Sequence, residues 1–264
     1  MTSLLVSNAV LSGPPRMIEV RDLTYRYAPD APDVLNGITL LIPEGSFTAI
    51  MGSNGSGKST LARCLNGLCK PTGGSVLVDG FRTDDDARSR EIRRKVGLVF
   101  QDPNLQITSV TVERELAFGL ENIGTGPEEM RERVEKYLGL FGFNGKNDVS
   151  PSSLSAGERQ RLAVASVMIL EPSYLVLDEA TSLLSVRSRN AMLDLVRDIR
   201  MQASVGIILI TQFPREAMLG ERLLVMHEGR LVFDGSPGEV FKNVESLLQM
   251  GVPVPTSERL RVAV

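Results

Sequence analysis

Residues 154–182 read LSAGERQRLAVASVMILEPSYLVLDEATS, and this stretch decides the fold of the 264-residue chain. A Leu-Ser-Ala-Gly-Glu turn precedes a helical pattern, and an apolar strand then ends in Asp178 and Glu179. Open α/β sheets bind their ligands at the carboxyl ends of their strands, where this strand delivers its two acids. The stretch therefore predicts an α/β fold with a ligand site just beyond Leu177.

A phosphate-binding motif lies upstream of this stretch. It follows a strand expected at residues 47–51, satisfies the pattern G-x-x-x-x-G-K-[ST], and reads Gly52-Ser53-Asn54-Gly55-Ser56-Gly57-Lys58-Ser59-Thr60. The glycines let backbone N–H groups turn toward phosphates, and Lys58 reaches the β- and γ-phosphates. The hydroxyl of Ser59 can bind Mg²⁺ at the start of a helix whose dipole favours anions. The strand before the motif and the helix after it argue against a chance glycine-rich turn.

The acids at the end of the later strand suit the same chemistry. Asp178 is expected to bind Mg²⁺, either directly or through water. Glu179 is placed to orient the attacking water or to accept its proton. A strand-end Asp-Glu pair can also simply cap the next helix, but its combination with the phosphate loop favours catalysis.

Hydrophobic patterning predicts the remaining architecture. Helices are expected at residues 112–121 and at Pro127–Leu140, where apolar and charged residues occupy opposite faces. β-Branched apolar residues punctuated by Gly and Pro predict short strands at residues 18–25, 37–42, 47–51 and 75–78. Near-continuous apolar runs at residues 96–100, 174–177 and 207–211, separated by helical patterns, predict the buried parallel sheet of an α/β core. Residues 225–233, with a turn at Glu228 and Gly229, are expected to form a closing hairpin.

Composition excludes several classes of protein. The net charge of −3 argues against the broad positive surface of a duplex-binding protein, so no nucleic-acid partner is expected. The sequence has no run of 18 or more apolar residues, which predicts that the chain does not span a membrane by itself. The two cysteines, Cys64 and Cys69, lie five apart in an expected helix and lack a second metal-ligand pair, so they are expected to pack in a reducing compartment.

Together the motifs resemble the ATP-binding cassette (ABC) family, in which two ATPase domains hold ATP between them. The resemblance covers nearly the whole chain from Met17 onward. It implies an α/β P-loop nucleotide-binding domain with an antiparallel β subdomain and an inserted α-helical subdomain. The expected parts are a flexible extension at residues 1–16, an ATPase domain at residues 17–245 and a C-terminal tail at residues 246–264. The helical subdomain is expected at about residues 102–165.

The resemblance assigns further site residues. Gln101, directly after an expected strand, resembles the Q-loop glutamine that contacts Mg²⁺ or the attacking water. Tyr27 lies where the family stacks an aromatic ring on adenine, and Tyr25 is its alternate, although an aromatic residue in a first strand is as often part of the core. The implied Mg²⁺ ligands are Ser59, Gln101 and Asp178, and the implied catalytic residues are Lys58, Gln101, Glu179 and Gln212.

The turn that opens residues 154–182 resembles the family signature Leu-Ser-Gly-Gly-Gln and consists here of Leu154, Ser155, Ala156, Gly157 and Glu158. In the family this segment faces the γ-phosphate held by a partner subunit, which implies a dimer. Ser155, the backbone near Gly157 and the helix dipole would make that contact. Ala156 adds a methyl group and Glu158 adds an acid near a phosphate, and both changes are expected to weaken dimer closure without abolishing it.

Two further departures affect catalysis. Ser185 stands where the family D-loop has Asp, and Gln212 stands where the family has a switch histidine. Gln212 can hydrogen-bond a γ-phosphate, but it cannot become cationic or relay a proton. Loss of such a transition-state contact costs about 3 to 4 kcal/mol. We therefore expect slow hydrolysis and an asymmetric heterodimer, in which this chain holds ATP at a slow site and completes a faster site on its partner.

Within the ABC family, residues 100–106, 111–113 and 117–122 resemble the ATPases of energy-coupling-factor importers, and the tail segments 235–241 and 248–255 are similar too. Those importers take up vitamins or transition-metal ions such as cobalt and nickel. Their parts are two ATPases, a transmembrane coupling protein and a small substrate-binding membrane subunit. The resemblance implies a place at the cytoplasmic face of the cell membrane, held there by membrane partners.

The acids Asp102, Glu113 and Glu115 are candidates for contacting basic coupling helices of such a partner, and the alternative for them is a solvated face. A competing function is a soluble ABC ATPase that works on DNA or ribosomes, or an ATP-gated regulatory module with little hydrolysis. Such proteins usually carry twin cassettes or long coiled-coil arms, and this sequence shows neither. Retention of Glu179 argues against a pure binding module.

Overall fold

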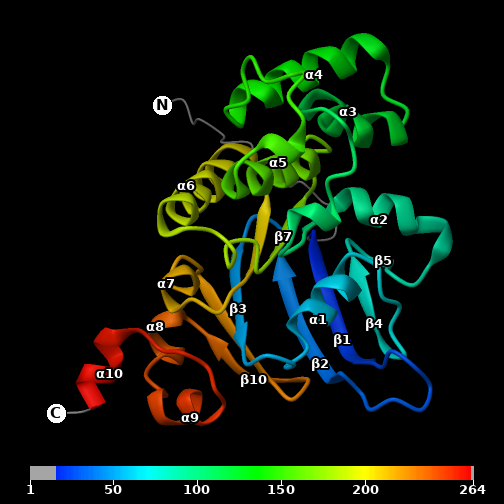
Figure 1. The fold of residues 1–264 in the computed structure, drawn as a ribbon. Coiled ribbons are helices and arrows are strands. Elements are labelled where there is room, and N and C mark those ends of the chain that lie inside the picture. The colour runs from blue at the N-terminus through cyan, green and yellow to red at the C-terminus, as the bar shows by residue number, and fades with distance from the viewer. Residues whose placement is uncertain (1–15, 263–264) are drawn as a thin grey trace, which may run out of the picture.

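A computed structural model describes residues 16–262, so almost all of the expected extension at residues 1–16 lies outside the described residues. An antiparallel sheet with the strand order β2-β1-β4-β5 lies at the lower right of Figure 1. Its strands are β1 (Met17–Tyr25), β2 (Leu35–Pro43), β4 (Gly73–Val78) and β5 (Phe81–Arg82). It forms the β subdomain that the family resemblance implies.

A second sheet forms the centre of the molecule and has the strand order β10-β9-β3-β8-β7-β6. Its neighbouring strands run parallel except for β10, which pairs antiparallel with β9 as a closing hairpin. The strands are β3 (Phe47–Gly52), β6 (Val96–Val99), β7 (Tyr174–Asp178), β8 (Gly206–Ile210), β9 (Arg222–His227) and β10 (Arg230–Gly235). Every residue of β3, β6, β7 and β8 is buried, as expected for parallel strands covered on both faces.

Alternation along these buried strands divides the interior into two large cores. Val176 and Ile208 pack with α1 (Lys58–Leu65) and the antiparallel sheet. Their neighbours Leu175 and Leu177 point to the opposite face and pack with the helices there. Those helices are α3 (Val112–Asn122), α4 (Pro127–Leu140), α5 (Ala156–Met168) and α6 (Val186–Ala203).

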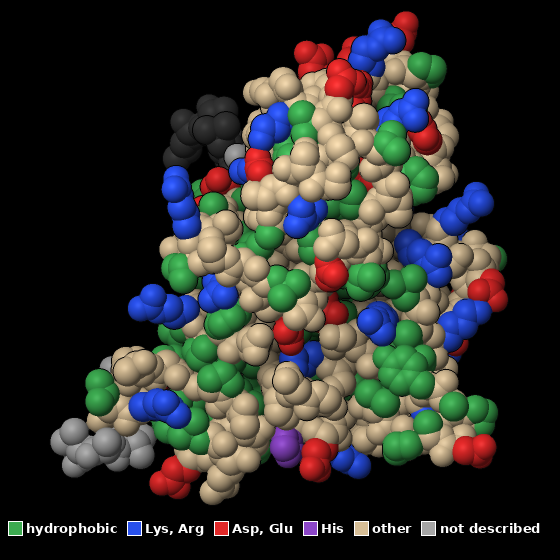
Figure 2. Space-filling view, in the orientation of Figure 1, with side chains coloured by type: hydrophobic (Ala, Val, Ile, Leu, Met, Phe, Trp, Pro, Cys, Tyr) green, Lys and Arg blue, Asp and Glu red, His purple; other side chains and the backbone are tan. Residues whose placement is uncertain are grey.

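The helical region stands above the central sheet in Figure 1, with α3 and α4 at the top and α5 beneath them. Pro127 begins α4 and Glu128 and Glu129 follow in its first turn, which suits both the orphan N–H groups and the dipole there. Figure 2 shows charged side chains of both signs crowded over this region. The helix α2 (Ser89–Lys95) lies beside the region and leads into β6.

The C-terminal part packs behind the phosphate loop. Val252 and Leu247 are fully buried against β3 and β9 side chains, including Met51. A Cβ atom at Gly251 would lie 3.7 Å from the Cβ of Ser53, so this part of the chain directly adjoins the loop. Its helices are α7 (Pro214–Ala217), α8 (Pro237–Val240), α9 (Val244–Gln249) and α10 (Thr256–Val262).

Within residues 16–262, no helix is both long enough and apolar enough to cross a membrane. The two cysteines are free thiols, and Cys64 packs fully buried in α1 whereas Cys69 lies beyond the end of that helix. Cys69 therefore differs from the expectation that both cysteines lie in one helix. The turn that follows Leu65 carries it away from the helix axis but leaves it against the same core.

Candidate active site

The phosphate loop connects the end of β3 to the start of α1, as its motif requires. Gly52 and Gly57 have no room for a side chain. A Cβ atom at Gly52 would approach the carbonyl oxygen of Met226 to 2.3 Å, and one at Gly57 would approach that of Val34 to 2.9 Å. The two glycines thus let the loop curl tightly against its neighbouring strands and keep its N–H groups facing inward.

Lys58 is folded into this loop. Its ammonium donates hydrogen bonds of 2.9 Å to the carbonyl oxygens of Gly52 and Ser53, and only 5% of the residue is exposed. Burial lowers the pKa of Lys58, whereas the nearby carboxylates of Glu179 and Asp178 act in the opposite direction. The fold therefore places a cation inside the loop before any phosphate binds.

Ser59 and Asp178 meet at the base of the loop. The Ser59 hydroxyl donates a 2.9 Å hydrogen bond to Oδ1 of Asp178, which joins the first turn of α1 to the end of β7. Burial raises the pKa of Asp178, and the Ser59 hydrogen bond offsets only part of that effect. A buried carboxylate beside a hydroxyl oxygen, with incomplete charge compensation, fits the oxygen-ligand chemistry of Mg²⁺.

A cleft of about 490 Å³ brings the predicted catalytic residues together. Four of them line it from separate parts of the chain, namely Lys58, Gln101, Glu179 and Gln212. The amide of Gln101 donates a 3.0 Å hydrogen bond to the hydroxyl of Ser182, so the Q-loop is tied to the segment just after Glu179. The arrangement can hold phosphates at one wall and present a carboxylate and two amides from the other.

Glu179 has a backbone conformation that few residues adopt. Its φ angle is +49°, and its N–H donates to the carbonyl oxygen of Ile210 on β8. A left-handed glutamate costs free energy, and such strain is concentrated at functional sites. The turn aims the residue out of the sheet end and into the cleft.

Tyr27 stands beside the phosphate loop. It is 56% exposed, its hydroxyl lies 3.0 Å from that of Thr60, and its ring meets Tyr25 edge to face at 5.0 Å. Tyr25 packs on the core beneath. Between the two alternatives, the exposed ring of Tyr27 is therefore the one available for stacking.

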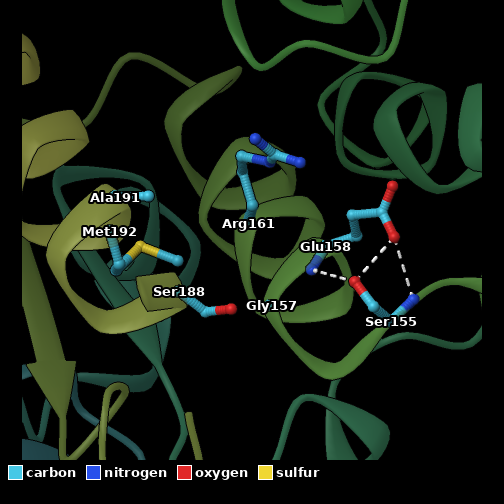
Figure 3. Close-up of a pocket in the computed structure, with 7 residues that line it drawn as sticks. All are labelled: Ser155, Gly157, Glu158, Arg161, Ser188, Ala191 and Met192. Atoms are coloured by element: carbon cyan, nitrogen blue, oxygen red, sulfur yellow. Dashed lines mark hydrogen bonds between the residues drawn. The ribbon is translucent and has the colours of Figure 1, made fainter. Parts of the chain in front are cut away.

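The signature segment lies away from this cleft, around a separate pocket of about 110 Å³ that Figure 3 shows. Ser155 caps α5, and Figure 3 shows its side chain facing Glu158 across the first turn. A Cβ atom at Gly157 would come within 2.8 Å of the Ser188 hydroxyl, so the glycine lets α6 pack directly on this turn. Leu154 is buried in the core, whereas the methyl group of Ala156 is exposed.

The D-loop residue Ser185 has a local role. Its hydroxyl accepts a hydrogen bond from the N–H of Ser188 at 3.3 Å and donates one to the Ser188 hydroxyl at 3.2 Å. Ser185 is therefore the N-cap of α6, a position that Ser and Asp fill about equally well. The exchange of Asp for Ser retains this cap but removes a charge.

A buried polar cluster that the sequence analysis missed joins the D-loop to the segment of Gln212. Glu216, 1% exposed, accepts hydrogen bonds from Thr181 at 2.7 Å and from Thr211 at 2.5 Å. Arg189 lies 3.6 Å from the same carboxylate and stacks 3.7 Å above the ring of Phe213. A Glu six residues after a strand end gives no signal in a single sequence, because exposed surface acids occur at the same spacing.

The expectation of a solvated face was wrong for Glu115. Glu115 is 4% exposed, and its carboxylate accepts the backbone N–H groups of Thr108 and Ser109 at 3.0 and 2.9 Å. It therefore fixes the loop ahead of α3, although it also lines the groove between α2, α3 and α5. The carboxylate of Asp102 likewise accepts from the N–H of Asn104, while Glu113 is exposed.

A comparison with protein families decides the assignment. A family model described as ABC transporter matches residues 35–182, which is more than half of the chain. The chain belongs to the ABC transporter family. Its matched region runs from β2 through the phosphate loop and signature to the D-loop, so the family resemblance and the fold class inferred from the sequence are confirmed. As a member of this family, the chain is an ATPase.

Curated ABC relatives match over most of their length. The energy-coupling factor transporter ATP-binding protein EcfA1 of Ligilactobacillus salivarius is 39% identical, over 93% of this chain and 86% of the relative. The cobalt import ATP-binding protein CbiO of Syntrophus aciditrophicus is 41% identical, over 92% and 87%.

Solved ABC structures share the fold of this chain. The cbiO1 protein of Clostridium perfringens, described as part of the ABC transporter complex cbiONQ, superposes with a TM-score of 0.80 at 33% identity, covering 94% of this chain and 99% of that chain. A dimeric ATP-binding cassette in a post-hydrolysis state, bound to ADP and Pi, superposes with a TM-score of 0.74 at 28% identity, covering 83% and 98%.

Proposed function

We propose that this chain is the ATP-hydrolysing subunit of an energy-coupling factor importer that takes up a vitamin or a transition-metal ion of the cobalt and nickel class. The similarity to EcfA1 and CbiO proteins over nearly their full length supports the importer type. The observation that carries the ATPase function is the single cleft shared by the phosphate loop and by Gln101, Glu179 and Gln212.

Different residues of the cleft bind the nucleotide, hold the metal and activate the water. Tyr27 stacks on adenine, and Lys58 with the N–H groups of residues 52–60 binds the phosphates. Ser59, Gln101 and Asp178 would hold Mg²⁺, which, when bound, offsets the negative charge of the phosphates. Glu179 orients the attacking water and accepts its proton.

Gln212 donates a hydrogen bond toward the γ-phosphate but carries no proton away, because an amide does not titrate. Hydrolysis at this site is therefore slow. The chain is accordingly one half of an asymmetric ATPase pair and holds ATP at its own slow site. It completes the faster site of its partner with the signature segment.

The separation of the two pockets supports this dimer. The signature pocket is lined by Ser155, Gly157 and residues of α6, and the ATP cleft by a different set of residues. One chain thus carries the two halves of a site at separate places, and a second ATPase brings a signature to each phosphate loop.

A groove of about 550 Å³ between α2, α3 and α5 is the proposed docking place for the transmembrane coupling subunit. Phe118 and Ile123 are 50% and 40% exposed there, which is unusual for residues of their size. The groove adjoins Phe100, next to Gln101, so docking and the ATP site share the Q-loop. This docking holds the chain at the cytoplasmic face of the membrane.

Affinity capture from native membranes tests the proposal. The tagged chain is purified from mildly solubilised membranes in MgATP, and its partners are identified by mass spectrometry. Recovery of a second cassette ATPase with small membrane subunits is expected, and the smallest membrane subunit identifies the substrate. A Lys58→Ala variant should keep the membrane subunits but fail to close on the second ATPase with ATP. Recovery with ribosomal or DNA-repair proteins instead would overturn the proposal.

A further inference from the structure

Glu158 replaces the glutamine of the family signature, and its carboxylate has two separate sets of partners. One oxygen, Oε2, accepts the backbone N–H of Ser155 at 2.9 Å and the Ser155 hydroxyl at 2.6 Å. The other oxygen, Oε1, accepts the ammonium of Lys146. Figure 3 shows the Ser155 side of this contact. The hydroxyl that the signature would offer to a γ-phosphate thus donates its single proton to a charged side chain in this structure.

The charge of Glu158 conflicts with the task of the signature. Lys146, first of all, and then the Ser155 hydrogen bonds lower the pKa of Glu158 to about 2, so the carboxylate is ionised at physiological pH. A bare carboxylate in the first turn of α5 would repel the γ-phosphate of a partner subunit, and such repulsion is strong in a closed, poorly solvated interface. The signature of this chain therefore works only if a cation compensates that charge.

Neighbouring cations are engaged elsewhere. Arg159 donates a hydrogen bond of 2.6 Å to the carbonyl oxygen of Leu154, and this bond stabilises the turn before α5. Arg161 lines the signature pocket with Ser155 and Glu158, but its guanidinium lies over the ring of Phe143, at 5.4 Å from its centre, and forms no ion pair with Glu158. Among residues 16–262, Lys146 is the basic residue that forms an ion pair with Glu158.

The backbone holds Lys146 in place. The loop that carries it follows α4, and the carbonyl oxygens of Asn147 and Val149 accept the N–H groups of Glu113 and Val112 at the start of α3. The backbone N–H of Lys146 donates a hydrogen bond of 2.9 Å to the carbonyl oxygen of Phe143, a fully buried residue. The lysine is therefore presented by a fixed loop, and its position does not depend on the ion pair alone.

We propose that Lys146 is a positioning residue for ATP hydrolysis in trans: it neutralises the charge of Glu158, which caps the signature turn at Ser155, so that the signature can accept the γ-phosphate bound by the partner ATPase. This inference rests on the proposed dimer. It assigns to Lys146 and Glu158 together the function that an uncharged glutamine performs in the family signature.

A charge-rescue experiment tests the inference on the assembled ATPase pair, with MgATP turnover and thermal melting measured for each variant. Lys146→Met leaves Glu158 unpaired and should lower kcat about tenfold or more, because a charge then faces the phosphate. Adding Glu158→Gln to Lys146→Met should restore kcat to within about twofold of the wild type. Glutamine keeps the capping contact with Ser155 without the charge. Lys136→Met, which removes an exposed lysine of α4, is the matched control and should leave kcat unchanged.

The outcomes separate the inference from the proposed function. An unchanged kcat for Lys146→Met, or a double variant no faster than Lys146→Met, would overturn the role of Lys146. A merely structural lysine predicts the second result, with both variants showing the same drop in melting temperature. If the wild-type pair itself fails to hydrolyse MgATP, the proposed function fails, whatever the variants do.

Discussion

Asp178 is the residue whose ionisation most clearly lowers the stability of the folded chain. Burial raises the pKa of Asp178 in the folded chain. The contribution of this group to the free energy of unfolding is therefore fully present below its ordinary pKa and is lost as the pH rises through its pKa in the folded chain. At neutral pH the ionised carboxylate therefore destabilises the nucleotide-free chain. The proposed function gives a reason for this acid, because its carboxylate would hold Mg²⁺.

Asp178→Asn should raise the melting temperature of the nucleotide-free chain by a few degrees at pH 7.5 and by less at pH 5. The same variant should lose Mg²⁺-dependent ATP hydrolysis. Differential scanning calorimetry at the two pH values measures the first effect. A variant that melts below the wild type at pH 7.5 would contradict a destabilising Asp178.

In the proposed function, Gln212 limits the rate of this site. Gln212→His should raise kcat at least about tenfold, because an imidazole adds a titrating hydrogen-bond donor beside the γ-phosphate. Steady-state phosphate release by the chain with its partner measures the change. The asymmetry is wrong if the wild-type chain alone turns over at an ordinary rate, needs Glu179, and is insensitive to position 212.

At the scale of elements, Glu216 joins three segments that surround the cleft. Its hydrogen bonds to Thr181 and Thr211 connect the D-loop to the segment of Gln212, and Arg189 brings in α6. Replacing the carboxylate leaves a largely buried guanidinium and two hydroxyl groups without their partner. The cluster therefore serves both the stability of the fold and the geometry of the site.

Glu216→Leu should lower the free energy of unfolding by about 3 kcal/mol, the scale for breaking a buried ion pair. Asp194→Asn provides the control, because its ion pair with Arg197 on α6 is exposed and should be worth less than about 1 kcal/mol. Urea denaturation of both variants measures the difference. Equal losses for the two variants would show that the buried cluster contributes no more than a surface pair.

Much of the architecture could be predicted from the sequence, since its signals are local. The apolar runs located β3, β7 and β8 to within a residue or two, and Pro127 with the acids after it located the start of α4. The phosphate loop was predictable from its glycines. Burial of Glu115 and Glu216 was not, because a carboxylate that accepts buried N–H or hydroxyl groups looks like a surface acid in sequence.

The site was predictable in part. The spacing of the motifs led to Lys58, Asp178 and Glu179, and the structure brings Lys58 and Glu179 into one cleft. The sequence could not reveal the contact between Lys146 and Glu158, because this contact depends on how the loop after α4 folds back on α5. Such contacts follow from tertiary packing and leave no pattern along the chain.

At the scale of the whole molecule, the phosphate loop and the signature occupy separate pockets of one chain. The β subdomain supports Tyr27, the central sheet supplies the acids, and the helical region carries the signature and the docking groove. A subunit of this form acts with a second ATPase. The proposed function depends on hydrolysis at the cleft with Glu179 as the base.

Phosphate release by the purified membrane complex, compared between the wild type and Glu179→Gln in MgATP, is the most direct test. Glu179→Gln should lower the turnover contributed by this chain's own site at least about a hundredfold while ATP binding is retained. The partner's site is silenced by the equivalent substitution so that the two sites are read separately. A wild-type complex that releases no phosphate from this site, or a Glu179→Gln variant that keeps the wild-type rate, would contradict the proposed function.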